Sequence, residues 1–203
     1  MVKAKAFYQT FKAKLKEDEG DTLERYWNAK SWTERLVKTS ITILEKDFQL
    51  KTNKEYFRID LIGWSGNPAW EKEGGEHISS KSCKKGSAPM LNEHYWNLEV
   101  ALEFENDPLD WSDEVIKLCH IKCGLKVVIG YVSYEQREIE CEMAKLDIVA
   151  NHMRALNYGK LGEEEQFLII LGNCGKKEYT CFDADIEFKA YIFNGDRFEF
   201  LDG

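Results

Sequence analysis

The sequence lacks any apolar run long enough to cross a bilayer. Its longest apolar runs, such as 167–171 and 127–129, have the length of strands, whereas a transmembrane helix needs about 20 residues. The first seven residues, MVKAKAF, also lack the apolar segment and the small-residue cleavage site of a secretory signal. We therefore expect no membrane contact and a cytoplasmic location.

A disulfide framework and a net positive charge are also missing. The six cysteines show no regular spacing, and a chain of 203 residues that is 43% hydrophobic has enough apolar material to fold without disulfides. The formal net charge of −8 argues against a protein that coats nucleic acid through its overall field, because nonspecific binding depends on the neutralisation of phosphates. A local basic patch is still compatible with this charge.

Several common catalytic and metal-binding motifs are absent or incomplete. There is no glycine-rich loop that could cradle a phosphate, and His77, His94 and His152 are not paired with a nucleophile as in a catalytic triad. Cys119 and Cys123 have the spacing of two ligands on one helix, but structural zinc sites need four ligands and no second pair is present. We expect these two cysteines on the buried face of a helix.

What the sequence does contain is a helical beginning followed by alternating strands and helices. Apolar residues at four-residue spacing predict a helix over 2–17, and Ser31 with Glu34 has the form of a capping box for a second helix that runs to about Asp47. The later elements are expected, in chain order, as strands over 56–64 and 95–105, a helix from Ser112 to Cys123, a strand over 125–134, a helix over 135–157, a strand over 166–171, and a hairpin with arms 186–193 and 197–201.

These elements predict one mixed α/β domain over 1–203, with no internal repeat and no low-complexity segment. Residues 65–93 are rich in Gly, Ser, Lys and Glu, so they are expected to form a loop inserted between two strands. A loop of this length inside a compact domain is usually functional or disordered.

Acidic residues are concentrated on one predicted strand. In the strand over 95–105, alternation places Glu99, Glu103 and Glu105 on one face. Like charges at neighbouring positions repel each other and are costly to bury. A divalent cation would relieve this repulsion, and Asp60 would supply an opposing carboxylate if its strand pairs with this one.

These residues, in this order of elements, resemble the PD-(D/E)xK, or restriction-endonuclease-like, nuclease superfamily. The similarity covers about 31–134: a helix, a strand with Asp60, a strand ending in Glu103-Phe104-Glu105, a helix and a strand. It implies a mixed central sheet flanked by helices, here with a helical N-terminal extension and a C-terminal hairpin. It also implies that Asp60 and Glu103 bind Mg²⁺ or Mn²⁺, and that the protein is a metal-dependent nuclease that hydrolyses phosphodiester bonds, with DNA as the expected substrate.

The chain departs from the family pattern at the third position of the triplet. Glu105 stands there instead of the usual lysine, as in the Glu-x-Glu version of some restriction enzymes. Some branches place the lysine on the following helix, which here would be Lys117 or, less favourably, Lys122. Some branches add a metal-binding acid from the first core helix, for which Glu34 is the first candidate and Glu45 the second. Glu105 or Lys117 would then orient the attacking water.

Each assignment has a structural alternative. The three glutamates are also typical of a solvated strand face, and Asp60 could form an ordinary ion pair with Arg58. Lysines on amphipathic helices most often face solvent, and this applies to Lys117.

The inserted loop is open to two interpretations as well. Lys81, Lys84 and Lys85 could grip a phosphate backbone, or they could belong to an ordinary surface loop. The alternative functions are therefore a noncatalytic nucleic-acid or protein interaction module on the same fold, and a subunit of a larger nuclease complex. A homodimer is compatible with the resemblance, because such nucleases often dimerise to cut both strands.

Overall fold

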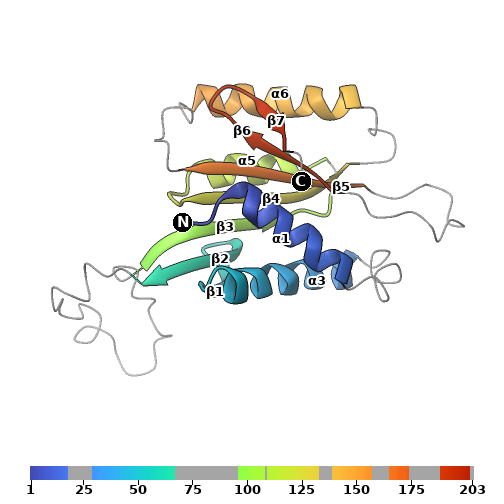
Figure 1. Cartoon of the computed structure of the whole chain (residues 1–203). Coiled ribbons are helices and arrows are strands. Elements are labelled where there is room, and N and C mark those ends of the chain that lie inside the picture. Colours follow the sequence, from blue (N-terminus) through green and yellow to red (C-terminus); the bar gives the residue numbers. More distant parts are fainter. Residues whose placement is uncertain are drawn as a thin grey trace, which may run out of the picture.

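The fold is organised around one mixed sheet. The computed structural model describes residues 1–17, 29–66, 96–107, 109–132, 139–156, 165–173 and 188–201. Seven strands form the sheet in the order β1-β2-β3-β4-β5-β6-β7, with helices on both faces (Figure 1). The strands are β1 Lys51–Tyr56, β2 Ile59–Gly66, β3 Trp96–Phe104, β4 Leu125–Val132, β5 Gln166–Asn173, β6 Phe188–Phe193 and β7 Phe198–Phe200; the helices are α1 Ala4–Glu17, α3 Ala29–Thr42, the π-helical turn η2 Ile43–Asp47, α5 Trp111–Cys119 and α6 Ile139–Ala155.

Strand direction changes across the sheet. The pairs β1–β2 and β2–β3 are antiparallel, the pairs β3–β4 and β4–β5 are parallel, and the pairs β5–β6 and β6–β7 are again antiparallel. Parallel neighbours need a crossover connection, and α5 and α6 supply the two crossovers. The buried residues of both helices belong to one core cluster, so both helices cover the same face of the sheet.

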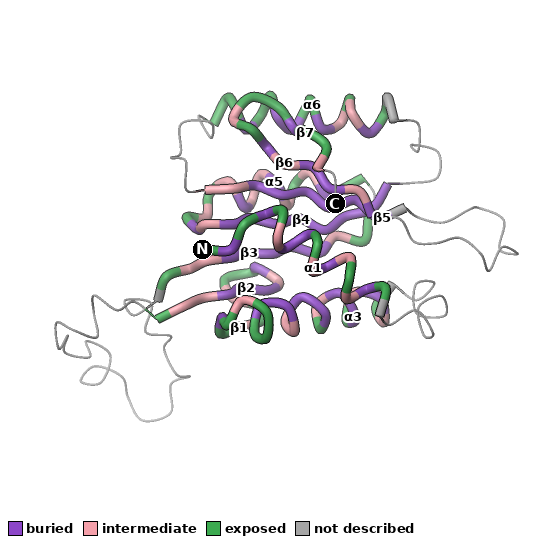
Figure 2. The backbone as a smooth tube through the Cα atoms, viewed as in Figure 1, coloured by how far each residue is buried: buried purple, intermediate pink, exposed green. Residues whose placement is uncertain are grey.

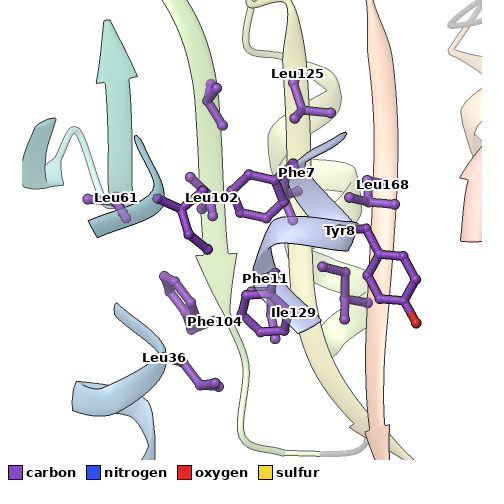
Figure 3. Close-up of a cluster of buried hydrophobic side chains, with 14 of the residues drawn as sticks. Phe7, Tyr8, Phe11, Leu36, Leu61, Leu102, Phe104, Leu125, Ile129 and Leu168 are labelled. Carbon is purple, nitrogen blue, oxygen red and sulfur yellow. The ribbon is translucent and has the colours of Figure 1, made fainter. Parts of the chain in front are cut away.

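The first face of the sheet is covered by α1 and α3. Figure 3 shows Phe7 and Phe11 of α1 lying over the side chains of β3 and β4. Tyr8 is buried beside them, and its hydroxyl donates a hydrogen bond to the carbonyl of Phe188 on β6 at 2.6 Å. The N-terminal helix is therefore an integral part of the core.

The second face is covered by α5 and α6. Every residue of β4 is buried, and the buried residues follow the central strands in Figure 2. Gly130 on β4 lets α5 approach closely, since a Cβ atom there would lie 2.7 Å from the Cβ of Trp111. No helix in the described ranges is long and apolar enough to span a membrane.

The prediction of a mixed α/β fold is confirmed, and the predicted C-terminal hairpin is present as β6 and β7. The strand expected over 56–64 begins only at Ile59, after a turn, and β1 precedes it. The sequence of β1, KTNKEY, gave no strand signal because this edge strand buries none of its side chains fully.

Three predicted helix boundaries were wrong. Ser31 lies inside α3, which includes Ala29, so it does not cap that helix. Ser112 lies in the first turn of α5, whose N-cap is Asp110. The same helix ends at Cys119 and not at Cys123, because the chain must turn back there to enter β4.

Candidate active site

Asp60 and Glu103 lie on adjacent antiparallel strands. The register pairs Leu61 of β2 with Leu102 of β3, which places Asp60 opposite Glu103. Asp60 Oδ2 accepts a hydrogen bond from the backbone N–H of Phe104 at 2.8 Å. The expected pairing of the two acidic strands is therefore confirmed.

Glu103 is buried on the face covered by α5 and α6, with 1% of its side chain exposed. Its neighbours Leu102 and Phe104 belong to the core on the other face, as strand alternation requires.

Glu99 does not share this position. The register shifts between β2 and β3, so that Gly63 pairs with Val100 and Trp64 with Leu98, and the intervening Glu99 has no pairing partner, as in a β-bulge. Its carboxylate accepts a hydrogen bond from the Ser65 hydroxyl at 3.0 Å and lies 3.5 Å from the Met1 amino group. The prediction of three carboxylates on one face is wrong for Glu99, because a bulge breaks the alternation.

Glu105 follows the end of β3 and serves the turn. Its Oε1 accepts a hydrogen bond from the backbone N–H of Asp107 at 2.7 Å, and its own N–H donates to the carbonyl of Ile129 at 3.0 Å. In the contacts of the described residues, its carboxylate closes the turn and does not meet Glu103.

Lys117 of α5 reaches the buried carboxylate. Its Nζ lies 2.8 Å from Glu103 Oε1 and 2.5 Å from Glu114 Oε2. It also donates a hydrogen bond to the backbone carbonyl of Arg58 at 3.0 Å. Asp60, Glu103, Glu114 and Lys117 thus form one group, which we call the carboxylate–lysine cluster.

Glu114 was missed by the sequence reasoning. Its position three residues before Lys117 places both on one face of α5, so a search of that helix for acids near the lysine could have found it.

Burial dominates the electrostatics of the cluster. It raises the pKa of Glu103 to about 8, helped by the charges of Asp60 and Glu114, although Lys117 opposes the shift. Burial also lowers the pKa of Lys117, but Glu103 and Glu114 outweigh it and raise that pKa above its usual value. Lys117 therefore stays protonated, and at neutral pH Glu103 also keeps its proton in most molecules, so its carboxyl group is largely neutral.

No family model matches the chain, and no curated protein or solved structure shows significant similarity to it. The chemistry of the cluster must therefore be inferred from its own residues.

The other predicted site residues lie elsewhere. Glu34 is exposed on α3. The buried side chains of α3 pack on the first face of the sheet, whereas Glu103 is buried on the second face. Glu45 Oε1 accepts a hydrogen bond from Thr52 Oγ1 at 2.5 Å, and Lys122 is exposed beyond α5.

Within the described part of the chain, no group of three or more His, Cys, Asp or Glu side chains is arranged to hold a metal ion. Lys81, Lys84 and Lys85, with most of the inserted loop 65–93, lie outside the described residues.

The two cysteines near α5 do not form a reactive pair. Burial raises the pKa of Cys119 to about 11 and that of Cys123 to about 12. Both thiols therefore stay protonated at neutral pH, whereas the thiolate is the nucleophile and the metal ligand.

Proposed function

We propose that the protein is a metal-dependent nuclease whose active site is the carboxylate–lysine cluster. The observation that carries the proposal is the convergence of Asp60, Glu103 and Lys117 from two paired strands and the helix after them. These residue types on these elements are what the PD-(D/E)xK resemblance implies for a branch with its lysine on the following helix. The order of helix, strands, helix and strand over 31–134 agrees with that resemblance.

The cluster fits a divalent cation in charge and in donor type. Asp60 and Glu103 would hold the ion, because Mg²⁺ takes one or two carboxylates and completes its shell with waters and substrate phosphate oxygens. Even with Glu103 protonated, the charges of Asp60 and Glu114 outnumber that of the one ammonium group, and a bound cation would favour the ionised form of Glu103. When bound, the ion would stabilise charge on the phosphate and lower the pKa of the attacking water.

The protein's own residues would perform the remaining tasks. Lys117 stays protonated, so it is suited to hold an anionic phosphate and to orient water, and not to abstract a proton. Its hydrogen bond to the Arg58 carbonyl and its ion pair with Glu103 fix the position of the ammonium group. Glu105, the other candidate for orienting water, is occupied by the Asp107 amide.

A cleavage panel tests the proposal. Plasmid, linear duplex, single-stranded and branched DNA, together with RNA, are incubated with Mg²⁺ or Mn²⁺ and wild type, Asp60→Ala or Glu103→Ala. We expect cleavage that needs the metal and falls at least about 100-fold in both variants. Glu99→Gln is the matched control, because it removes an acid from the same strand outside the cluster. An inactive wild type on every substrate, or full activity in Asp60→Ala, would contradict the proposal.

A noncatalytic interaction module is the second candidate, favoured by the ion pairs that Lys117 already makes with Glu103 and Glu114. Titration calorimetry separates the two functions. A nuclease should bind Mg²⁺ or Mn²⁺ in a way that Glu103→Ala abolishes, whereas an interaction module should show no such binding.

A further inference from the structure

The turn between β1 and β2 has an unusual sequence for its backbone. Tyr56 pairs with Ile59, so Phe57 and Arg58 form a two-residue hairpin loop. Phe57 has φ 48° and Arg58 has φ 64°. Positive φ at both central positions belongs to the type I′ turn, where Asn-Gly is preferred and a bulky side chain is disfavoured. Strained residues of this kind persist where function requires the side chain.

The side chains of this turn point to a binding role. Phe57 is 74% exposed, more than any other large hydrophobic side chain in the described ranges. Its ring meets the Tyr56 ring edge to face, with centroids 4.6 Å apart, and Tyr56 packs in turn against the core of the second face. Phe57 is thus held in position while most of its surface stays open to solvent. Arg58 beside it is exposed as well.

The turn is attached to the carboxylate–lysine cluster. The Arg58 carbonyl accepts the 3.0 Å hydrogen bond from Lys117 Nζ, and Asp60 follows only two residues later. An exposed aromatic residue and an exposed arginine therefore stand on a turn whose backbone contacts the lysine of the cluster. This local positive charge matters in a chain with a net charge of −8, which would otherwise repel a polyanion.

We propose that the Phe57-Arg58 turn binds the substrate, with Phe57 stacked on an unpaired base and Arg58 on a neighbouring phosphate. The substrate class is then single-stranded or locally unpaired nucleic acid, because bases inside an intact duplex already stack on each other and offer no free face. Arginine suits the second role because its planar fork matches phosphate oxygens. This inference rests on the proposed nuclease function and specifies its substrate.

Binding to a labelled single-stranded oligonucleotide, measured by fluorescence anisotropy with Mg²⁺, tests the stacking. The full chain carries Asp60→Asn, which prevents cleavage and keeps an acceptor for the Phe104 N–H. We expect Phe57→Ala to weaken binding about tenfold, Phe57→Trp to preserve it, and a matched duplex to bind more weakly. Phe200→Ala removes another exposed aromatic ring, 56% exposed on β7, and should change nothing.

A fluorescent base analogue in the oligonucleotide supplies a direct readout of stacking. Its emission should be quenched by the protein with Phe57 and by the Phe57→Trp variant, and not by Phe57→Ala. A purely structural role of the turn would not produce this pattern of quenching. If the wild type cleaves nucleic acid but Phe57→Ala binds single strands and quenches as before, this inference fails and the nuclease proposal stands. If the wild type neither binds nor cleaves any nucleic acid, both fail.

Discussion

Two lysines of the second face bind buried or partly buried carboxylates, but they differ in their exposure to solvent. Lys126 of β4 is completely buried, and its Nζ lies 2.5 Å from Glu165 Oε2. Lys117 is 37% exposed and serves Glu103 and Glu114, with Asp60 close by. A further ion or a substrate can approach the carboxylate–lysine cluster through the exposed side of Lys117, whereas Lys126 is closed off from solvent. We therefore propose a structural role for the Lys126 pair and a catalytic role for the cluster.

The largest expected difference between the two lysines is in activity. Lys117→Met should reduce metal-dependent cleavage at least about 100-fold, because it removes the charge that holds the phosphate and orients water. Lys126→Met should retain cleavage in the folded fraction of the protein. Initial rates, normalised to the folded fraction from circular dichroism, provide the measurement. An equal loss of cleavage rate in both variants would contradict a catalytic role that belongs to Lys117 and not to Lys126.

For stability, replacement of Lys126 should have a larger effect than replacement of Lys117. Lys126→Ala leaves the carboxylate of Glu165 without its buried partner and should lower the free energy of unfolding by about 3 kcal/mol. Urea denaturation measures this change. The double variant Lys126→Met with Glu165→Gln should recover much of the loss, because no uncompensated charge remains. Lys117→Met should lower the free energy of unfolding by less, because Lys117 is partly exposed to solvent.

The dependence of stability on pH should identify Glu103. Its pKa is about 8 in the folded protein, against 4.5 for an unperturbed glutamate. Between these pH values Glu103 holds a proton in the folded state that it has lost in the unfolded state. The contribution of Glu103 to the free energy of unfolding is therefore greatest below pH 4.5 and falls as the pH rises toward 8. We expect a decrease on the order of a few kcal/mol.

Glu103→Gln should remove this slope, and Glu99→Gln should keep it; urea titrations at several pH values make the comparison. In the wild type, Mg²⁺ should reduce the decrease, because a bound cation favours the ionised carboxylate. An unchanged slope in Glu103→Gln would mean that another group causes it.

The smallest effect is expected at the strained turn. Replacing Phe57-Arg58 by Asn-Gly should raise the free energy of unfolding by about 1 kcal/mol, because these residues accept positive φ readily. The same variant should lose affinity for single-stranded nucleic acid. Thermal denaturation and anisotropy together test this, and a destabilised variant would show that the native turn is not strained.

The general fold could be predicted from the sequence because its central strands are strongly patterned. β4 and β5 are apolar runs of strand length, and the Asn194-Gly195 hairpin carries its own turn signal. β1 could not be predicted, because a polar edge strand has no buried face to reveal its period.

The candidate site was predictable in part. Asp60, Glu103 and Lys117 were found from their positions on successive elements, and the structure brings them together. The place of Glu99 was missed because the bulge in β3 depends on pairing with β2, which the alternation of one strand does not contain. The Phe57-Arg58 turn was missed because its backbone lacks the usual Asn-Gly signal, so these residues were assigned to a strand interior.

The hydrogen bond from Tyr8 to Phe188 has a consequence for biosynthesis. It joins residues 180 positions apart, and Ala4 N–H likewise donates to Gln166 Oε1 across 162 positions. The first helix leaves the ribosome well before its partners on β5 and β6 are translated. Contacts of such sequence separation form slowly, so α1 should remain available to chaperones and proteases at least until β5 and β6 have been translated.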